Sequence, residues 1–299
     1  MAFRNVIIES PARLSLKNEQ LIVFTDREYR LPVEDLSALL LENRQSTITA
    51  AALSRLGQSG CAVFVCDEKH MPCAVLTPFS QHSRALTAAR NQLAISEPRK
   101  KRLWQSVVRA KIRGQAACLR WQGKEAAANE LEGLADRVRS GDPDNVEATA
   151  AQLYFPALFG EGFGRREEDG RNAGLNYGYA ILRGCTARCL AVYGFLPAFG
   201  IHHSGSLNAF NLADDLMEPF RPLVDMIVAA EFLPEDALTP ERKRQLFNCL
   251  NLDVLSGGAH HSAVYAMERL VQSYSRALQE KDAALLLPEL RELRQHRYE

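Results

Sequence analysis

The residues most capable of chemistry are carboxylates and imidazoles that lie in separate parts of the 299-residue sequence. Hard divalent cations such as Mg²⁺ and Mn²⁺ prefer carboxylate oxygens, and Mn²⁺ also accepts an imidazole. Such an ion stabilises the charge that develops on a phosphate under attack and activates the attacking oxygen. A few acids and a histidine gathered beside basic side chains would therefore suit phosphodiester chemistry on nucleic acid.

The stretch 211–222 contains three acids, Asp214, Asp215 and Glu218. On a helix, Glu218 shares a face with each of the two aspartates, because residues three and four apart are neighbours. Neighbouring like charges repel unless a cation lies between them or solvent screens them. Pro219 predicts a kink or bend directly after Glu218. Residue types alone favour a solvated acidic face, with a metal site as the alternative.

Two histidine pairs follow glycines in the sequence. His202 and His203 lie in the apolar loop 199–205, shortly before the acidic stretch. His260 and His261 have no carboxylate pair close to them. Such histidines either bind a metal or form structural hydrogen bonds, and the first pair is the better candidate for a ligand.

Glu147 lies on a helical face that is otherwise apolar and includes Tyr154 and Leu158. An acid in that position needs a partner, a metal or solvent. Alternatively, Glu147 merely occupies the first turn of a helix, where acids are favoured. The sequence supports both interpretations equally.

The segment 99–124 concentrates positive charge in a chain whose 36 Lys and Arg balance 36 Asp and Glu. It contains no acid, two tryptophans and nine basic residues, which are Arg99, Lys100, Lys101, Arg102, Arg109, Lys111, Arg113, Arg120 and Lys124. A basic helix with aromatic residues suits contact with a phosphate backbone. The alternative pairs this segment with acids such as Glu125, Glu130 and Glu132. Arg165 and Arg166 belong to a looser basic group diluted by acids.

Two kinds of hydrophobic spacing predict the strands and helices that must position these residues. Short apolar runs predict strands near 6–8, 13–17, 21–24, 38–41, 61–66 and 73–76, with one helix over 46–56 capped by Ser46 or Thr47. Helical spacing then predicts 82–95, 99–122, 124–140, 145–159, 174–194, 207–232, 239–250 and 261–282. We therefore expect an α+β fold, with a small β-rich domain at 1–78 and a larger all-α catalytic domain at 79–299.

The composition excludes several classes of protein. Hydrophobic residues make up 46% and charged residues 24%, which excludes intrinsic disorder. The seven cysteines form no C-x-x-C zinc pattern and are expected to be reduced thiols of a cytoplasmic protein. No 18-residue apolar run predicts a membrane span, and the first residues lack the apolar core of a signal peptide.

Taken in order, four segments resemble a known family. They are Glu147-x6-Tyr154-Phe155, then 172–179 (Asn-Ala-Gly-Leu-Asn-Tyr-Gly-Tyr), then 200–203 (Gly-Ile-His-His), then 215–222 (Asp-Leu-Met-Glu-Pro-Phe-Arg-Pro). The chain resembles the CRISPR-associated integrase that captures new spacers in antiviral defence, the larger of the two universal adaptation proteins. The last segment looks most like members from systems with a single large RNA-guided effector nuclease.

The resemblance implies a catalytic metal site formed by Glu147, His203 and Glu218, with Mg²⁺ or Mn²⁺ as the cofactor. An imidazole ligand favours Mn²⁺ slightly. Asp215 matches a further acid of the family motif that assists the metal or the DNA. Asp214 has no counterpart and is expected to be a solvated acid.

The resemblance also implies partners. The β-rich domains form a homodimer, and two such dimers are bridged by a dimer of the second adaptation protein, with the effector nuclease as a further contact. The assembly binds double-stranded DNA and joins its 3′-hydroxyl ends into a CRISPR repeat, and water in place of the hydroxyl gives endonuclease activity. Residues expected to contact the DNA backbone are Arg99, Lys100, Lys101, Arg102, Arg109, Lys111, Arg113, Arg165 and Arg166. The alternatives are a stand-alone metal-dependent repair nuclease and a non-catalytic DNA-binding scaffold.

Overall fold

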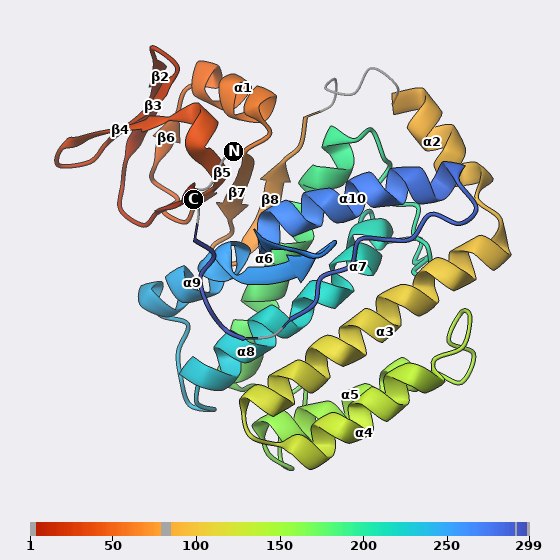
Figure 1. Cartoon of the computed structure of the whole chain (residues 1–299). Coiled ribbons are helices and arrows are strands. Elements are labelled where there is room, and N and C mark those ends of the chain that lie inside the picture. The colour runs from red at the N-terminus through yellow and green to blue at the C-terminus, as the bar shows by residue number, and fades with distance from the viewer. Residues whose placement is uncertain (1–3, 79–84, 291, 298–299) are drawn as a thin grey trace.

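The computed structural model describes residues 4–78, 85–290 and 292–297. A β-rich region comes first in the chain and a mainly helical region follows (Figure 1). This order confirms the division predicted from the hydrophobic period. The proposed boundary after residue 78 meets residues 79–84, which lie outside the described residues, so it stays a prediction.

The β-rich region contains two four-stranded sheets. The first has the order β1-β5-β7-β8, with β1 (Arg4–Ile8), β5 (Leu36–Leu41) and β7 (Ala62–Cys66) parallel and β8 (Pro72–Leu76) antiparallel. The second has the order β4-β3-β2-β6, formed by β2 (Arg13–Lys17), β3 (Gln20–Phe24), β4 (Glu28–Pro32) and β6 (Thr47–Ile48). A short 3₁₀ turn η1 (Val33–Asp35) and helix α1 (Ala50–Ser59) complete this region. Every strand expected from the sequence is present, and β4 and β6 are additional.

Helix α1 begins later than predicted. Its N-cap is Thr49, whose side chain accepts a hydrogen bond from the Ala52 N–H at 3.3 Å. Thr47 and Ile48 instead pair with β2 as a parallel strand. The expectation of a helix from Ser46 was therefore wrong, because β-branched residues pack well on a sheet edge and lower helix propensity.

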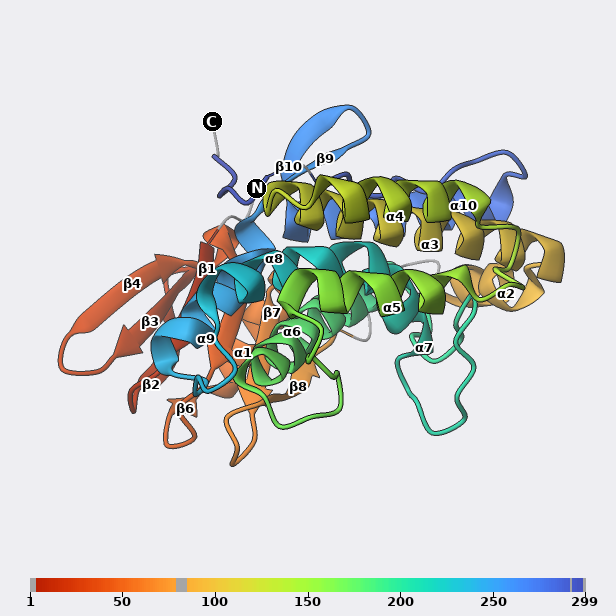
Figure 2. The same ribbon diagram turned by 90° about the horizontal axis from the view of Figure 1, so that it is seen from below.

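The second region consists mainly of long helices. Its elements are α2 (Ala85–Ala94), α3 (Glu97–Trp121), α4 (Glu125–Arg137), α5 (Val146–Phe159), α6 (Gly170–Val192), α7 (Asn211–Met217), η2 (Glu218–Phe220), α8 (Arg221–Glu231), α9 (Pro240–Phe247), η3 (Asn248–Asn251) and α10 (Ala263–Gln279). Figure 2 shows α3 and α4 side by side in one layer, with α5, α6 and α8 beneath them. The described part of the segment expected at 82–95 begins at Ala85, since 82–84 lie outside the described residues.

The helical region is not all-α, which corrects that part of the expectation. Strands β9 (Asp253–Ser256) and β10 (Ala259–Ser262) form an antiparallel hairpin. Its two-residue turn is Gly257-Gly258, with φ of 62° and 81°. Both turn positions need positive φ, which glycine adopts without steric cost, so the Gly-Gly pair marks this hairpin in the sequence.

One hydrophobic core joins the two regions. Ala38, Leu40 and Phe64 of the first sheet belong to the same buried cluster as the apolar faces of α3, α6, α8 and α10. A smaller cluster between the two sheets and α1 includes Leu14, Leu21 and Leu56. The β-rich region is therefore packed against α6.

In the described residues no helix is long and apolar enough to cross a lipid bilayer.

Candidate functional site

Glu147 lies in the first turn of α5, as one of the two sequence interpretations proposed. Asp142 stabilises this helix start, because its carboxylate accepts hydrogen bonds from the N–H groups of Val146 at 2.9 Å and Glu147 at 3.0 Å. The Glu147 side chain is 23% exposed and points to α3, where its Oε1 lies 2.5 Å from Lys111 Nζ. The first-turn position therefore does not exclude a functional role, since the carboxylate faces another charged group.

Glu218 lies at the break between α7 and α8, in the 3₁₀ turn η2. Pro219 cannot donate the backbone hydrogen bond of a continuous helix, and a 3₁₀ turn separates α7 from α8 at this point. The Glu218 side chain is only 4% exposed, and its Oε2 lies 2.6 Å from Lys111 Nζ while its Oε1 lies 2.9 Å from Arg221 Nε. Burial raises the pKa of Glu218, but the positive charges of Lys111 and Arg221 outweigh it, and the pKa lies below its ordinary value.

Lys111 thus joins the two glutamates that the sequence singled out. Its Nζ contacts one oxygen of Glu147 and one oxygen of Glu218, although these residues come from different helices. Burial lowers the pKa of Lys111, and the two carboxylates together raise it above its ordinary value. The oxygens of Glu147 and Glu218 therefore converge on one cationic atom.

His203 is held by Asp215, which is completely buried. The Asp215 carboxylate accepts hydrogen bonds from the backbone N–H groups of Ile201 at 2.6 Å, His202 at 3.0 Å and His203 at 3.1 Å, and its Oδ1 lies 2.6 Å from His203 Nδ1. A Cβ at Gly200 would lie 2.3 Å from the His203 carbonyl oxygen, so only glycine fits this turn. Asp215 thereby fixes the loop and leaves Nε2 as the ring nitrogen of His203 that can bind a ligand.

The environment of the His203 imidazole favours its protonated form. The hydrogen bond to Asp215 raises the pKa of His203, burial opposes it, and the charges of Asp215, Glu218 and Glu147 raise it further. Trp104, which is 1% exposed, stacks on the His202 ring with centroids 4.2 Å apart and meets the His203 ring edge-on at 5.7 Å. A tryptophan of the basic segment thus packs behind the histidine loop.

These residues fit a divalent ion by their chemistry, although their present arrangement is not a finished coordination shell. Two carboxylates that share a cation, beside an imidazole oriented through its other nitrogen, are a donor set suited to Mg²⁺ or Mn²⁺. Over the residues that the structure describes, however, no three His, Cys, Asp or Glu side chains are already grouped to hold a metal. Lys111 occupies the place between the two glutamates instead.

Asp214 is not a solvated acid, which corrects that expectation. Its carboxylate lies 2.8 Å from Arg183 Nε and accepts a hydrogen bond from Asn208 Nδ2 at 2.7 Å. Asp215, in turn, directs its oxygens to the loop backbone and to His203 rather than to Lys111. Asp215 therefore anchors the histidine loop, whereas Asp214 joins α7 to Arg183 of α6 and to Asn208.

A further polar layer lies behind Glu218 and was not anticipated from the sequence. Asp225, which is 1% exposed, accepts hydrogen bonds from Tyr154 Oη at 2.9 Å and Tyr179 Oη at 2.5 Å. The guanidinium of Arg221 lies 4.6 Å from the centre of the Tyr179 ring. Burial raises the pKa of Asp225 to about 6 against the lowering effect of the two tyrosine hydrogen bonds. Glu218 and Arg221 are three residues apart, and this spacing could have indicated their ion pair. No local feature of the sequence indicates that Tyr154 and Tyr179 share Asp225 as their partner.

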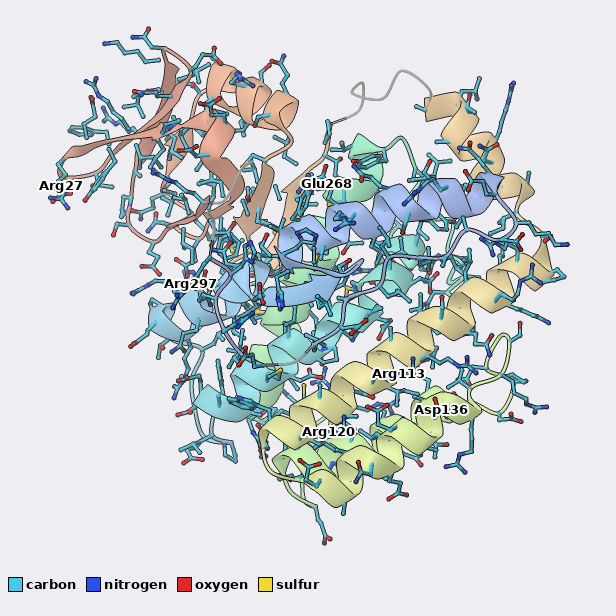
Figure 3. All side chains as sticks on the ribbon, in the orientation of Figure 1. Arg27, Arg113, Arg120, Asp136, Glu268 and Arg297 are labelled. Carbon is cyan, nitrogen blue, oxygen red and sulfur yellow. The ribbon has the colours of Figure 1, made fainter. Side chains whose placement is uncertain are left out.

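The C-terminal half of the basic segment pairs with acids of α4. Arg113 Nη2 lies 2.9 Å from Asp136 Oδ1, and Arg120 Nη1 lies 2.9 Å from Glu132 Oε1. Figure 3 shows Arg113, Arg120 and Asp136 along the adjoining helices α3 and α4. Intramolecular pairing, the alternative considered from the sequence, thus describes these arginines.

Other basic residues differ in what they contact. Arg99 donates to the carbonyls of Ala277, Glu280 and Ala283 at the end of α10, and Arg109 donates to the carbonyls of Asp136 and Val138. Lys100 pairs with Glu97, while Arg165 bonds Asn172 and Asn176 and lies near the rings of Phe155 and Tyr179. Lys101, Arg102 and Arg166 are exposed. Arg113 is also exposed but is paired with Asp136, whereas Lys100 is only partly exposed, at 28%.

The second histidine pair belongs to a different cluster. Asp253 of β9 binds His260 Nδ1 at 2.6 Å, His296 Nδ1 at 2.7 Å and Arg294 Nη2 at 2.9 Å. This cluster joins the β9–β10 hairpin to the C-terminal segment, which also pairs with it through Leu255 and Glu289. All seven cysteines are free, as expected.

Solved structures share this fold. A casposase bound to its integration product superposes with a TM-score of 0.76 at 18% identity, covering 96% of this chain and 93% of that one. A partial Cas6-RT-Cas1–Cas2 complex gives 0.66 at 20%, covering 97% and 99%, and a TtCas1–DNA complex gives 0.53 at 17%, covering 92% and 90%. At these identities the likeness defines the class of fold alone.

Sequence comparison is more specific. The CRISPR-associated endonuclease Cas1 of Neisseria meningitidis serogroup C (strain 8013) is 42% identical over 304 aligned residues, covering 100% of both chains. The family model described as CRISPR-associated protein Cas1 matches residues 6–242. The chain therefore belongs to the Cas1 family, which confirms the resemblance recognised in its motifs.

Proposed function

We propose that this protein is a metal-dependent DNA endonuclease and integrase of CRISPR adaptation. It inserts short foreign duplexes into a CRISPR array by attack of a 3′-hydroxyl on a phosphodiester bond of the repeat. Membership of the Cas1 family, a relative named as an endonuclease and the fold of a casposase solved with its integration product all support this proposal. The observation that carries it is that Glu147 and Glu218 both contact the ammonium of Lys111, in a site that also includes the oriented His203.

The proposed ligands are Glu147, His203 and Glu218. Mg²⁺ or Mn²⁺ would neutralise the phosphate under attack and favour ionisation of the attacking hydroxyl. Asp215 fixes the tautomer and direction of His203, and Arg221 holds Glu218 by an ion pair at 2.9 Å. Both contacts position side chains of the site before DNA arrives.

We propose that the exposed basic residues Lys101, Arg102 and Arg166, with the partly exposed Lys100, contact the DNA backbone, since backbone contacts position a nucleic acid without reading its sequence. The proposed partners are double-stranded DNA, a second copy through the β-rich region, and the second adaptation protein in a heterohexamer. The single-effector subtype adds the RNA-guided nuclease as a further partner. The fold neighbours solved with Cas2 and with DNA support the first and third of these, and the proposed place of action is the cytoplasm.

Strand transfer into a repeat-containing plasmid tests this function. We expect Glu218→Gln and His203→Ala to abolish transfer and cleavage while duplex binding persists. The matched variant Glu130→Gln, an exposed acid on α4, keeps full activity. Unchanged activity in both site variants would contradict the proposed ligands. Transfer that is independent of the second adaptation protein and of the repeat would favour a stand-alone nuclease, and binding without any reaction would favour a scaffold.

A further inference from the structure

Lys111 is more deeply buried than a residue that binds the DNA backbone through its charge would need to be. It lies on α3 with its side chain only 14% exposed, whereas its neighbour Arg113 on the same helix is 53% exposed. Its ammonium contacts Glu147 Oε1 at 2.5 Å and Glu218 Oε2 at 2.6 Å. The group that links the two carboxylates is therefore a side chain of the protein itself.

The two glutamates already contact an equal number of positive charges without any added ion. Glu147 and Glu218 supply two negative charges, and Lys111 and Arg221 supply two positive charges that contact them. Glu218 is nearly inaccessible to water, so an excess of charge here would be weakly screened. A divalent ion added while Lys111 and Arg221 stay in place would set four positive charges against the two charges of these carboxylates.

A divalent ion that bridges the two glutamates would occupy the place where the ammonium now lies. Mg²⁺ binds carboxylate oxygens at about 2.0–2.1 Å, and Lys111 Nζ lies between Glu147 Oε1 and Glu218 Oε2 at 2.5 and 2.6 Å. The ion and the ammonium therefore cannot both lie between these two oxygens at the same time. Because lysine carries its charge on a flexible four-carbon stem, the ammonium can swing away without movement of α3.

We propose that Lys111 is a built-in counter-cation that competes with the catalytic metal for Glu147 and Glu218. It keeps the two carboxylates together before the ion binds and leaves when the ion arrives. The displaced ammonium is then next to the site and can contact a phosphate of the DNA. This inference rests on the proposed function, because it takes these glutamates as metal ligands.

Binding of Mn²⁺ to the full-length protein, followed by the electron paramagnetic resonance of free Mn²⁺, tests the competition. If Lys111 holds the carboxylates in about nine-tenths of the molecules, its removal lowers the dissociation constant about tenfold. We expect that gain in Lys111→Met, together with a lower melting temperature without metal and a larger rise on adding Mn²⁺. Lys111→Arg, which keeps the charge, and Lys17→Met, an exposed lysine of β2, should bind as the wild type does.

The outcomes separate the two proposals. Wild-type affinity in Lys111→Met, with binding weakened by Glu218→Gln, would overturn the competition and leave the metal site intact. Mn²⁺ affinity unaffected by both Glu147→Gln and Glu218→Gln would overturn the metal site and the competition with it. Should Lys111→Met fail to fold, Lys111→Gln is measured in its place, and the same tenfold gain is required of it.

Discussion

The buried carboxyl of Asp225 predicts a pH-dependent stability that can be isolated by one isosteric change. Asp225 lies behind the site with two tyrosine hydroxyls as its hydrogen-bond donors. Its pKa is raised from 3.8 to about 6, chiefly because burial disfavours the charged form. Asp225→Asn removes the ionisable group and keeps the shape of the side chain.

The magnitude follows from proton linkage. One pKa unit corresponds to about 1.4 kcal/mol, so a rise of this size corresponds to about 3 kcal/mol. Between the two pKa values the folded protein binds the proton and the unfolded chain does not. Stability from this group is therefore complete below the unfolded pKa and is lost as pH rises through the folded pKa.

Urea denaturation of the wild type and of Asp225→Asn at a series of pH values from 4 to 7.5 measures this effect. The difference in unfolding free energy between the two proteins should shift by about 2–3 kcal/mol across that range, with the wild type losing stability relative to the variant as pH rises. Groups shared by both proteins cancel in the difference. A difference that stays constant with pH, or that changes in the opposite direction, would refute this account of Asp225.

Two further predictions concern the histidine loop and the basic helix. Trp104→Ala should lower the unfolding free energy, measured by urea denaturation, by about 3–5 kcal/mol, because it removes a fully buried side chain. The His202 ring stacks on that indole and the His203 ring meets it edge-on, so both contacts are lost. A loss below about 1 kcal/mol would contradict that packing. Reversing the exposed Lys101 and Arg102 to Glu should weaken duplex binding and reduce the slope of log affinity against log salt by about two. An unchanged slope in filter-binding titrations would remove these two residues from the DNA-binding surface.

The elements that carry the site were largely predictable, because local physics decides them. The change from period-two to helical spacing near residue 78 separates the β-rich region from the helices. Pro219 has no N–H to donate, and α7 ends shortly before it, at Met217, where the 3₁₀ turn η2 begins. The positions of Glu147 in a helix start and of His203 in a loop follow from equally local signals.

Other features escaped prediction because their determinants lie far apart in the chain. Thr47 and Ile48 form a strand only because β2 offers an edge, and local capping signals predicted a helix there. Asp214 was expected to be a solvated acid, but the fold places Arg183 against its carboxylate. The pairing of the α3 arginines with acids such as Glu132 was only one of two alternatives in the sequence, and the packing of α4 against α3 decides it.

The amino-acid sequence by itself determined which residue types are present, the order of strands and helices, and the family motifs that hold Glu147, His203 and Glu218. Only the tertiary structure decided that Asp215 serves the histidine loop, and that Lys111 stands between two carboxylates 36 and 107 residues away. The physical reason is that hydrophobic periodicity and capping act over a few neighbouring residues. Charge pairing in a buried site instead depends on which helices the core brings together.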